Sequence, residues 1–220
     1  MKIEVNGIEL FYEKEGSGPP LVLLHGNGED HFIFDESTEL LKRNFTVYRP
    51  DSRGHGGSSR TAELHYQDMA DDVACFIETL GLDRPVLFGF SDGGIIGLLA
   101  ASQHPQLLSA LIVSGANTEP KGLKPFIYGI FRLLFVFKKD PAIRLMLTEP
   151  NITKDELGRI HIPVLVTAGQ RDMIRAEHTR LIAEHIPGSR LVILPGESHG
   201  SYIVHSRKIA KIIEEAVNEN

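Results

Sequence analysis

Short apolar runs alternate with stretches of helical period along most of this chain. After an opening hairpin the runs are LVLLHG, TVYRPD, PVLFGF, ALIVSGA, PVLVTAG and RLVILPG. Continuous apolar runs of this length are typical of strands that are buried between two layers of helices. The pattern therefore predicts an α/β fold with a mostly parallel central sheet and helices on both faces.

A turn motif places the opening strands, and helical periodicity places the helices. Strands near residues 2–5 and 9–13 are expected to pair across Asn6-Gly7, because this residue pair readily takes the positive φ angles of a tight turn. Helical periodicity predicts helices over residues 33–43, 66–80, 93–104, 176–185 and 203–217.

The alternation breaks once, over residues 117–162. The segment has an apolar stretch, GLKPFIYGIFRLLFVFKK, followed by a polar stretch with prolines, DPAIRLMLTEPNITKDELGRI. We interpret it as a short helical cap inserted above the sheet. With 220 residues and 42% hydrophobic content, residues 1–220 are expected to form one domain.

Composition limits the partners. The 23 basic and 29 acidic residues are spread along the chain without a basic block, so no nucleic-acid partner is expected. The single cysteine, Cys75, cannot form an internal disulfide, and the amino-terminal segment alternates polar and apolar residues, so a cytoplasmic location is expected. The most apolar segment, residues 126–137, is interrupted by Arg132 and is too short for a membrane span. The sequence does not fix the oligomeric state.

Ser91 is the candidate nucleophile. It lies in GFSDGG, between the strand-like run PVLFGF and an apolar helix. Small residues two positions before and after a serine let a strand and a helix pass closely around a strained turn that exposes the hydroxyl. A glycine-rich turn before a helix also serves as a plain connection or as a phosphate cradle. The partners of Ser91 decide between these interpretations.

His199 is the candidate base for Ser91. A serine hydroxyl needs a base to accept its proton, and a histidine can do this at neutral pH. His199 lies in the polar loop GESHG between the last strand-like run and the final helix, so it should project at the carboxyl edge of the sheet. Surface or packing roles are expected for the histidines of amphipathic helices, which are His104, His178, His185 and His205.

Asp172 is the candidate acid. It follows the run PVLVTAG and should reach the same edge, where a carboxylate can hold the tautomer of the base and stabilise its protonated form. After the preceding run, Asn117 is not ionisable and Glu119 lies further into the insertion. Capping of the following helix is the alternative role for Asp172.

Backbone N–H groups of Asn27 and Asp92 are the candidate oxyanion donors. Acyl transfer needs donors that are fixed before the reaction. Asn27 lies in the loop HGNG after the run LVLL, and Asp92 begins the helix that follows Ser91. His25 is interpreted as a residue that orients its loop. These groups suffice for the reaction and the sequence has no metal-spaced cluster of His, Cys or carboxylates, so we expect no cofactor and no metal site.

With these residues in hand, the chain resembles the α/β-hydrolase superfamily, in particular its small esterase-like members. The resemblance extends nearly end to end, from the hairpin through the loops 25–28 and 51–58 to Ser91, Asp172 and His199, in the chain order of that superfamily. It implies that the loop 51–58 is structural, so Arg53 and His55 stay outside the catalytic set. Dehalogenases and epoxide hydrolases of this fold have an aspartate at the position of Ser91, the turn between strand and helix. A serine at this turn therefore implies an acyl-enzyme.

The expected function is hydrolysis of a small carboxylic ester, or of a thioester or lactone, through an acyl-serine intermediate. Two alternatives stay open: a carbon–carbon bond hydrolase or lyase on the same scaffold, and a ligand receptor that retains the triad. The substrate pocket is expected under an apolar roof, although the same residues would also pack the insertion onto the domain. These residues are Phe126, Ile130, Phe131, Leu134 and Phe137. The Asp92 side chain either complements the positive end of its helix or selects an ammonium-bearing substrate.

Overall fold

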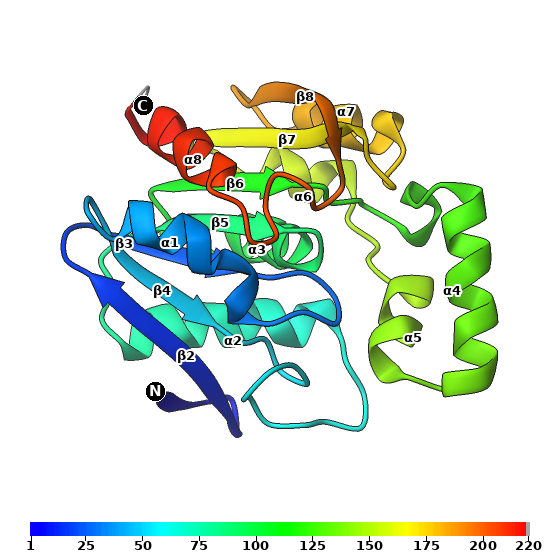
Figure 1. Ribbon diagram of the computed structural model, residues 1–220, viewed down its shortest axis with the longest axis horizontal. Coiled ribbons are helices and arrows are strands. Elements are labelled where there is room, and N and C mark those ends of the chain that lie inside the picture. The colour runs from blue at the N-terminus through cyan, green and yellow to red at the C-terminus, as the bar shows by residue number, and fades with distance from the viewer. Residues whose placement is uncertain (219–220) are drawn as a thin grey trace.

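The computed structural model describes residues 1–218, and a mixed sheet forms its centre (Figure 1). The strand order is β1-β2-β4-β3-β5-β6-β7-β8. The strands are β1 (Lys2–Val5), β2 (Ile8–Gly16), β3 (Pro20–Leu24), β4 (Thr46–Pro50), β5 (Val86–Phe90), β6 (Ala110–Ser114), β7 (Val164–Arg171) and β8 (Arg190–Ser198). β2 pairs antiparallel with β1 and β4, and the pairings from β4 to β8 are parallel. The predicted fold class is confirmed.

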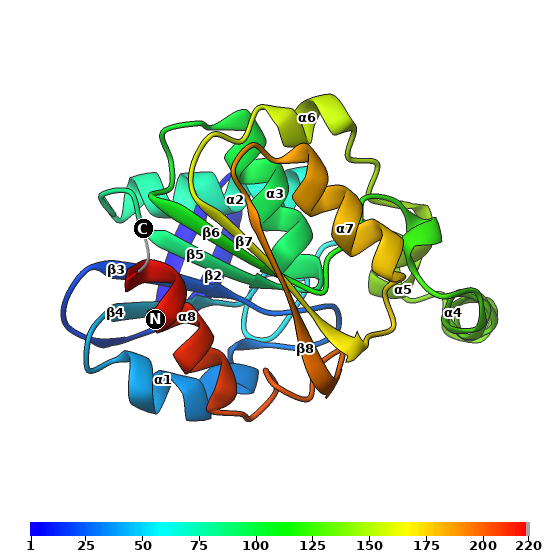
Figure 2. The same cartoon turned by 90° about the horizontal axis from the view of Figure 1, so that it is seen from above.

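Helices cover both faces of the sheet (Figure 2). One face carries α2 (Tyr66–Thr79), α3 (Asp92–Gln103), α6 (Lys154–Gly158) and α7 (Ala176–His185), and the other carries η1 (His31–Phe34), α1 (Asp35–Leu41) and α8 (Lys208–Asn218). Side chains of β3 alternate between the two cores: Val22 and Leu24 join the first, and Leu21 and Leu23 join the second. The continuous apolar runs are therefore strands that bury both faces.

The hairpin, the end of β2 and the start of α8 show how local conformation and pairing set the element bounds. Asn6 and Gly7 have φ of 45° and 77°, as the tight turn between β1 and β2 requires. β2 runs to Gly16, beyond the predicted end at residue 13, because its second half pairs with β4. α8 begins at Lys208, later than predicted, because His205 has a φ of 46° and its N–H donates to the Ile33 carbonyl. A left-handed residue with an outside partner cannot continue a helix.

The insertion between β6 and β7 holds short helices, as predicted. They are η2 (Pro120–Gly122), α4 (Pro125–Lys138), α5 (Pro141–Thr148) and α6. α4 and α5 pack on each other beyond the carboxyl ends of the parallel strands, at the right of Figure 1. α6 instead packs against α3 and α7, so it belongs to the layer that covers the sheet. Within residues 1–218, no helix combines the length and apolarity that a membrane crossing requires.

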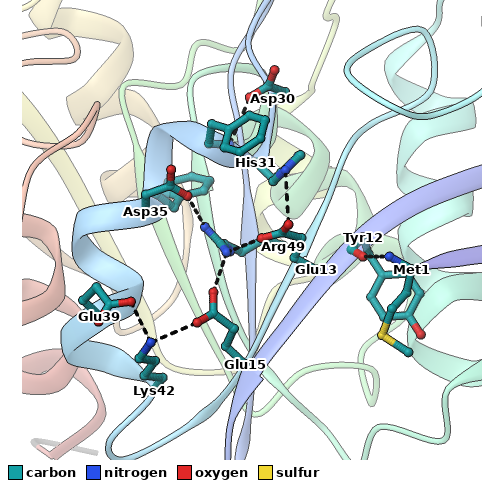
Figure 3. Close-up of polar contacts among 12 residues, drawn as sticks. Met1, Tyr12, Glu13, Glu15, Asp30, His31, Asp35, Glu39, Lys42 and Arg49 are labelled. Carbon is teal, nitrogen blue, oxygen red and sulfur yellow. Dashed lines mark hydrogen bonds and ion pairs between the residues drawn. The ribbon is translucent and has the colours of Figure 1, made fainter.

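A buried cation ties the antiparallel edge to the parallel sheet (Figure 3). The Arg49 side chain of β4 is 3% exposed and donates to Glu13 and Glu15 of β2 and to Asp35 of α1, at 2.5 to 2.6 Å. The three carboxylates are half-exposed, so they stay partly solvated while they neutralise the buried guanidinium. Arg49 therefore holds β2 and α1 against β4, the strand that pairs with β3.

Candidate active site

The predicted site residues follow the ends of four strands. Asn27 lies in the loop after β3, Ser91 follows β5, Asp172 follows β7 and His199 follows β8. β3, β5, β6, β7 and β8 are consecutive parallel neighbours, so their carboxyl ends meet at one edge. The fold brings together residues that are 172 positions apart, from Asn27 to His199.

Ser91, His199 and Asp172 form a continuous hydrogen-bonded chain. His199 Nε2 lies 3.0 Å from Ser91 Oγ, and His199 Nδ1 lies 2.7 Å from Asp172 Oδ1. The Nδ1–H donates to the carboxylate, which leaves the Nε2 lone pair facing the serine hydroxyl. Asp172 is 4% exposed and also accepts the Ile174 N–H at 2.8 Å. The geometry allows His199 to accept the Ser91 proton and Asp172 to stabilise the resulting imidazolium.

Ser91 occupies a strained turn between β5 and α3. Its φ of 52° and ψ of −113° are rare for a residue with a side chain. A Cβ at Gly89 would lie 2.2 Å from the Gly93 carbonyl oxygen, and a Cβ at Gly93 would lie 2.3 Å from the Leu24 carbonyl oxygen. The two glycines flanking Ser91 are therefore required by close backbone contacts, as the sequence pattern predicts.

The two predicted oxyanion donors are backbone groups without a protein acceptor. In the region that the structure describes, the N–H groups of Asn27 and Asp92 form no hydrogen bond. The Asn27 side chain fixes its loop, because Nδ2 donates to Asp92 Oδ2 at 2.8 Å and to the Ala142 carbonyl at 2.9 Å. Glu29 Oε2 accepts the Gly26 N–H at 3.0 Å. Fixed donors of this kind can stabilise an oxyanion without reorganisation.

The His25 side chain fixes the loop that carries Asn27 through two hydrogen bonds. Its Nδ1–H donates to the Gly26 carbonyl at 2.8 Å, and its Nε2 accepts the Ser52 N–H at 3.0 Å. Burial lowers the pKa of His25 to about 4, with a further lowering from the adjacent His55, so the ring is neutral near pH 7. These contacts agree with the predicted structural role of His25.

The Asp92 carboxylate is buried beside Ser91, and its hydrogen-bond partners come from α2 and from the loop after β3. Oδ1 accepts the Tyr66 hydroxyl of α2 at 2.7 Å, and Oδ2 accepts the Asn27 amide. Burial raises the pKa of Asp92 from its ordinary value, against the lowering by these two hydrogen bonds. Burial also raises the pKa of Tyr66. Sequence reasoning missed Tyr66, because nothing in its helical pattern marks a contact with a residue 26 positions away.

Gly115, directly after β6, was also missed. Its φ is +64°, and a Cβ there would lie 2.8 Å from His199 Cε1 and 2.9 Å from His199 Nδ1. The glycine next to the end of the run ALIVSGA was the available signal. A bare backbone at this position lets the His199 ring lie against the end of β6.

A cavity of about 180 Å³ opens beside Ser91 and His199. Its polar wall includes Asn27 and Asp92, and Phe131 of α4 contributes to its apolar wall. Of the expected roof residues, only Phe131 lines the cavity. Phe126, Ile130 and Phe137 are exposed, and the half-buried Leu134 lies outside the lining. This is a correction to the predicted roof: successive helical residues turn by about 100°, so Phe126 and Ile130 lie away from the face that carries Phe131.

Glu29 lines both this cavity and a larger cleft of about 820 Å³. Burial raises the pKa of Glu29 from its ordinary value, while the Gly26 N–H and His199 lower it. The cleft is lined by further carboxylates, which are Glu13, Asp30 and Asp140, and by Arg60. Sequence reasoning did not single out Glu29. Among residues 1–218, no group of three or more His, Cys, Asp or Glu side chains is arranged to hold a metal ion.

Comparison with known proteins shows the family to which the chain belongs. The model of the alpha/beta hydrolase fold matches residues 19–152, which include the loop of Asn27 and the turn at Ser91. The chain belongs to the alpha/beta hydrolase fold family. In enzymes of this fold that carry a serine at the turn between strand and helix, that serine is the nucleophile. The expectation of a serine hydrolase with this fold agrees with the match.

Relatives extend the likeness over nearly the whole chain. Human serine hydrolase BPHL is 28% identical, and the alignment covers 97% of this chain and 84% of BPHL. The pimeloyl-[acyl-carrier protein] methyl ester esterase of Aeromonas hydrophila is 26% identical, and the alignment covers 93% of this chain and 98% of the esterase. The solved structure of a thermophilic esterase from Thermogutta terrifontis superposes with a TM-score of 0.80 at 25% identity, covering 100% and 98% of the two chains.

Proposed function

We propose that this chain hydrolyses a small carboxylic ester through an acyl intermediate on Ser91, with thioesters and lactones served by the same machinery. The observation that carries the proposal is the hydrogen-bonded chain from Ser91 through His199 to the buried Asp172, at the mouth of a cavity. The relatives named serine hydrolase, methyl ester esterase and esterase support it.

The reaction follows from the positions of these groups. Ser91 Oγ attacks the ester carbonyl while its proton passes to His199 Nε2, and Asp172 stabilises the imidazolium. The N–H groups of Asn27 and Asp92 receive the oxyanion. The imidazolium then protonates the leaving alcohol and the acyl-serine forms. A water activated by His199 releases the acid in the second half of the reaction. No step uses a cofactor.

The cavity size and wall favour a short acyl group. A volume of about 180 Å³ lies below the range of roughly 300 Å³ and more that drug-sized ligands occupy. Its wall combines the polar groups of the nucleophile region with Phe131, Met146 and Met173. An acyl chain of a few carbons would fit against this apolar side, while longer chains would have to leave the cavity.

A fluorophosphonate probe with peptide mapping tests the nucleophile. Labelling is expected on Ser91 and lost in Ser91→Ala, and turnover of short-chain esters should fall by about 10⁴-fold or more. Asp172→Asn should lower kcat on the order of 10³- to 10⁴-fold, because the histidine tautomer is no longer held. Unchanged thermal unfolding of both variants would show that the losses are chemical.

The same assays can contradict the proposal. Labelling at another residue, or labelling that survives in Ser91→Ala, would overturn the assignment of the nucleophile. Cleavage of a diketone or release of cyanide in the absence of ester turnover would favour a carbon–carbon hydrolase or a lyase. Stable capture of ligand without steady-state turnover would favour a receptor.

A further inference from the structure

Helix α4 presents an apolar face to solvent. Phe126 is 77% exposed, Leu133 is 61% exposed and Phe137 is 78% exposed, and Val136 and Ile130 add to the same surface. The α4 helix stands at the outer edge of the molecule in Figure 1, and Figure 2 shows it end-on, apart from the sheet layers. None of its residues is fully buried.

The two sides of α4 differ in their surroundings. The half-buried side faces the rest of the protein with Ile127, Tyr128, Phe131, Leu134 and Phe135. Four of the exposed residues, Phe126, Ile130, Leu133 and Phe137, recur at the spacing that forms one face of a helix. The remaining large exposed apolar residues in the described part of the chain are scattered over other segments: Met1, Phe32, Leu191 and Ile193. An apolar helix face exposed to solvent in this way is typical of an interaction site.

Basic residues are concentrated in and next to α4 in the sequence. Residues 121–140 carry five basic side chains, which are Lys121, Lys124, Arg132, Lys138 and Lys139, and one acid, Asp140, whereas the whole chain has a net charge of −6. Within residues 1–218 none of the five basic groups forms an ion pair, although the Lys139 ammonium lies 5.4 Å from the centre of the Phe135 ring. The positive charge is therefore available to a partner.

We propose that the exposed face of α4, residues 126, 130, 133, 136 and 137, docks on the surface of an anionic lipid bilayer. Phenylalanine and leucine side chains would enter the boundary between headgroups and acyl chains, and the flanking cations would contact anionic headgroups. A second copy of this chain is a poorer occupant, because a symmetric contact through α4 would bring two sets of five cations together.

Docking has a consequence for the site. Phe131, on the inner side of the same helix, lines the cavity beside Ser91, so a docked α4 would hold the cavity about one helix diameter, roughly 10 Å, from the bilayer surface. Access of membrane-dissolved esters to the cavity rests on the proposed function. The docking itself does not, since no residue of the exposed face belongs to the catalytic set.

Vesicle co-sedimentation of the full chain tests the proposal. The protein and Ser91→Ala should both bind phosphatidylcholine vesicles that contain phosphatidylglycerol, more weakly as salt rises, and should bind pure phosphatidylcholine far less. Phe126→Ser with Phe137→Ser should weaken binding by roughly tenfold or more. Lys138→Gln with Lys139→Gln should weaken it by roughly tenfold at low salt. Phe32→Ser and Lys211→Gln are matched controls, exposed at other elements, and should bind as the parent does.

Circular dichroism and turnover of a water-soluble ester show whether the α4 variants remain folded. Absence of binding to anionic vesicles at low salt would overturn the proposal, as would equal binding to neutral vesicles. A dimer that dissociates in Phe126→Ser with Phe137→Ser, without vesicle binding, would assign the face to a second copy. Vesicle binding by an inactive Ser91→Ala would support docking, and a failure of ester turnover in the parent protein would affect only the proposed function.

Discussion

At the scale of single residues, Gly115 tests how closely the backbone must approach His199. Gly115→Ala places a Cβ 2.8 Å from His199 Cε1 and 2.9 Å from Nδ1, so the ring must shift. A shift of about 1 Å can lower turnover by about 10²-fold. We therefore expect kcat/KM for a short-chain ester to fall on that order, with a stability loss of about 1 to 2 kcal/mol from the positive φ of 64°. Steady-state kinetics and urea unfolding measure the two effects.

Gly188→Ala is the matched control for Gly115→Ala. Gly188 has a φ of +72°, but a Cβ there would meet no atom within 4 Å. The control should therefore lose a similar amount of stability and keep its kcat/KM. Equal losses of activity in the two variants would show that the contact with His199 is not the cause.

At the scale of elements, the crossing of α3 over β3 depends on Gly93. A Cβ at Gly93 would lie 2.3 Å from the Leu24 carbonyl oxygen, a backbone atom that cannot move without its strand. A Cβ at Gly97, one turn later, would meet only methyl groups of Leu111 and Leu87 at 2.9 Å, and these side chains can adjust. Gly93→Ala should therefore lower the free energy of unfolding by about 3 kcal/mol or more.

Gly97→Ala serves as the comparison within the same helix. Alanine is favoured over glycine in a helix by about 1 kcal/mol, which offsets the small adjustment of the two leucines. The net change in the free energy of unfolding should stay within about 1 kcal/mol. Urea denaturation of both variants measures the difference, and similar destabilisation at the two positions would rule out the backbone contact as the determinant.

Element patterns also show what the sequence could predict. The apolar runs predicted the strands because a strand buried on both faces has consecutive apolar residues. The strand ends then placed Ser91, Asp172 and His199 at one edge of the sheet. The contact between Tyr66 and Asp92 has no local sequence pattern, because it joins two separate helices. The periodicity of α4 separates Phe126 from Phe131, but only the tertiary structure determines which of them faces the cavity.

At the scale of the whole molecule, the partly buried Glu29 links folding to pH. Burial raises the pKa of Glu29 above its ordinary value of 4.5, so between these two values the folded state binds more protons than the unfolded chain. The free energy of unfolding contributed by this group therefore falls as pH rises through that window.

Glu29→Gln keeps an acceptor for the Gly26 N–H and removes the titration. Its stability relative to the parent should rise from pH 4.5 through the raised pKa of Glu29 and then level off. Urea unfolding across this pH range measures the difference. Glu177→Gln should give the opposite sign, because a backbone hydrogen bond lowers the pKa of the exposed Glu177, so the parent gains stability as pH rises. A pH-independent difference for Glu29→Gln would show that its carboxylate stays as well solvated in the folded protein as in the unfolded chain.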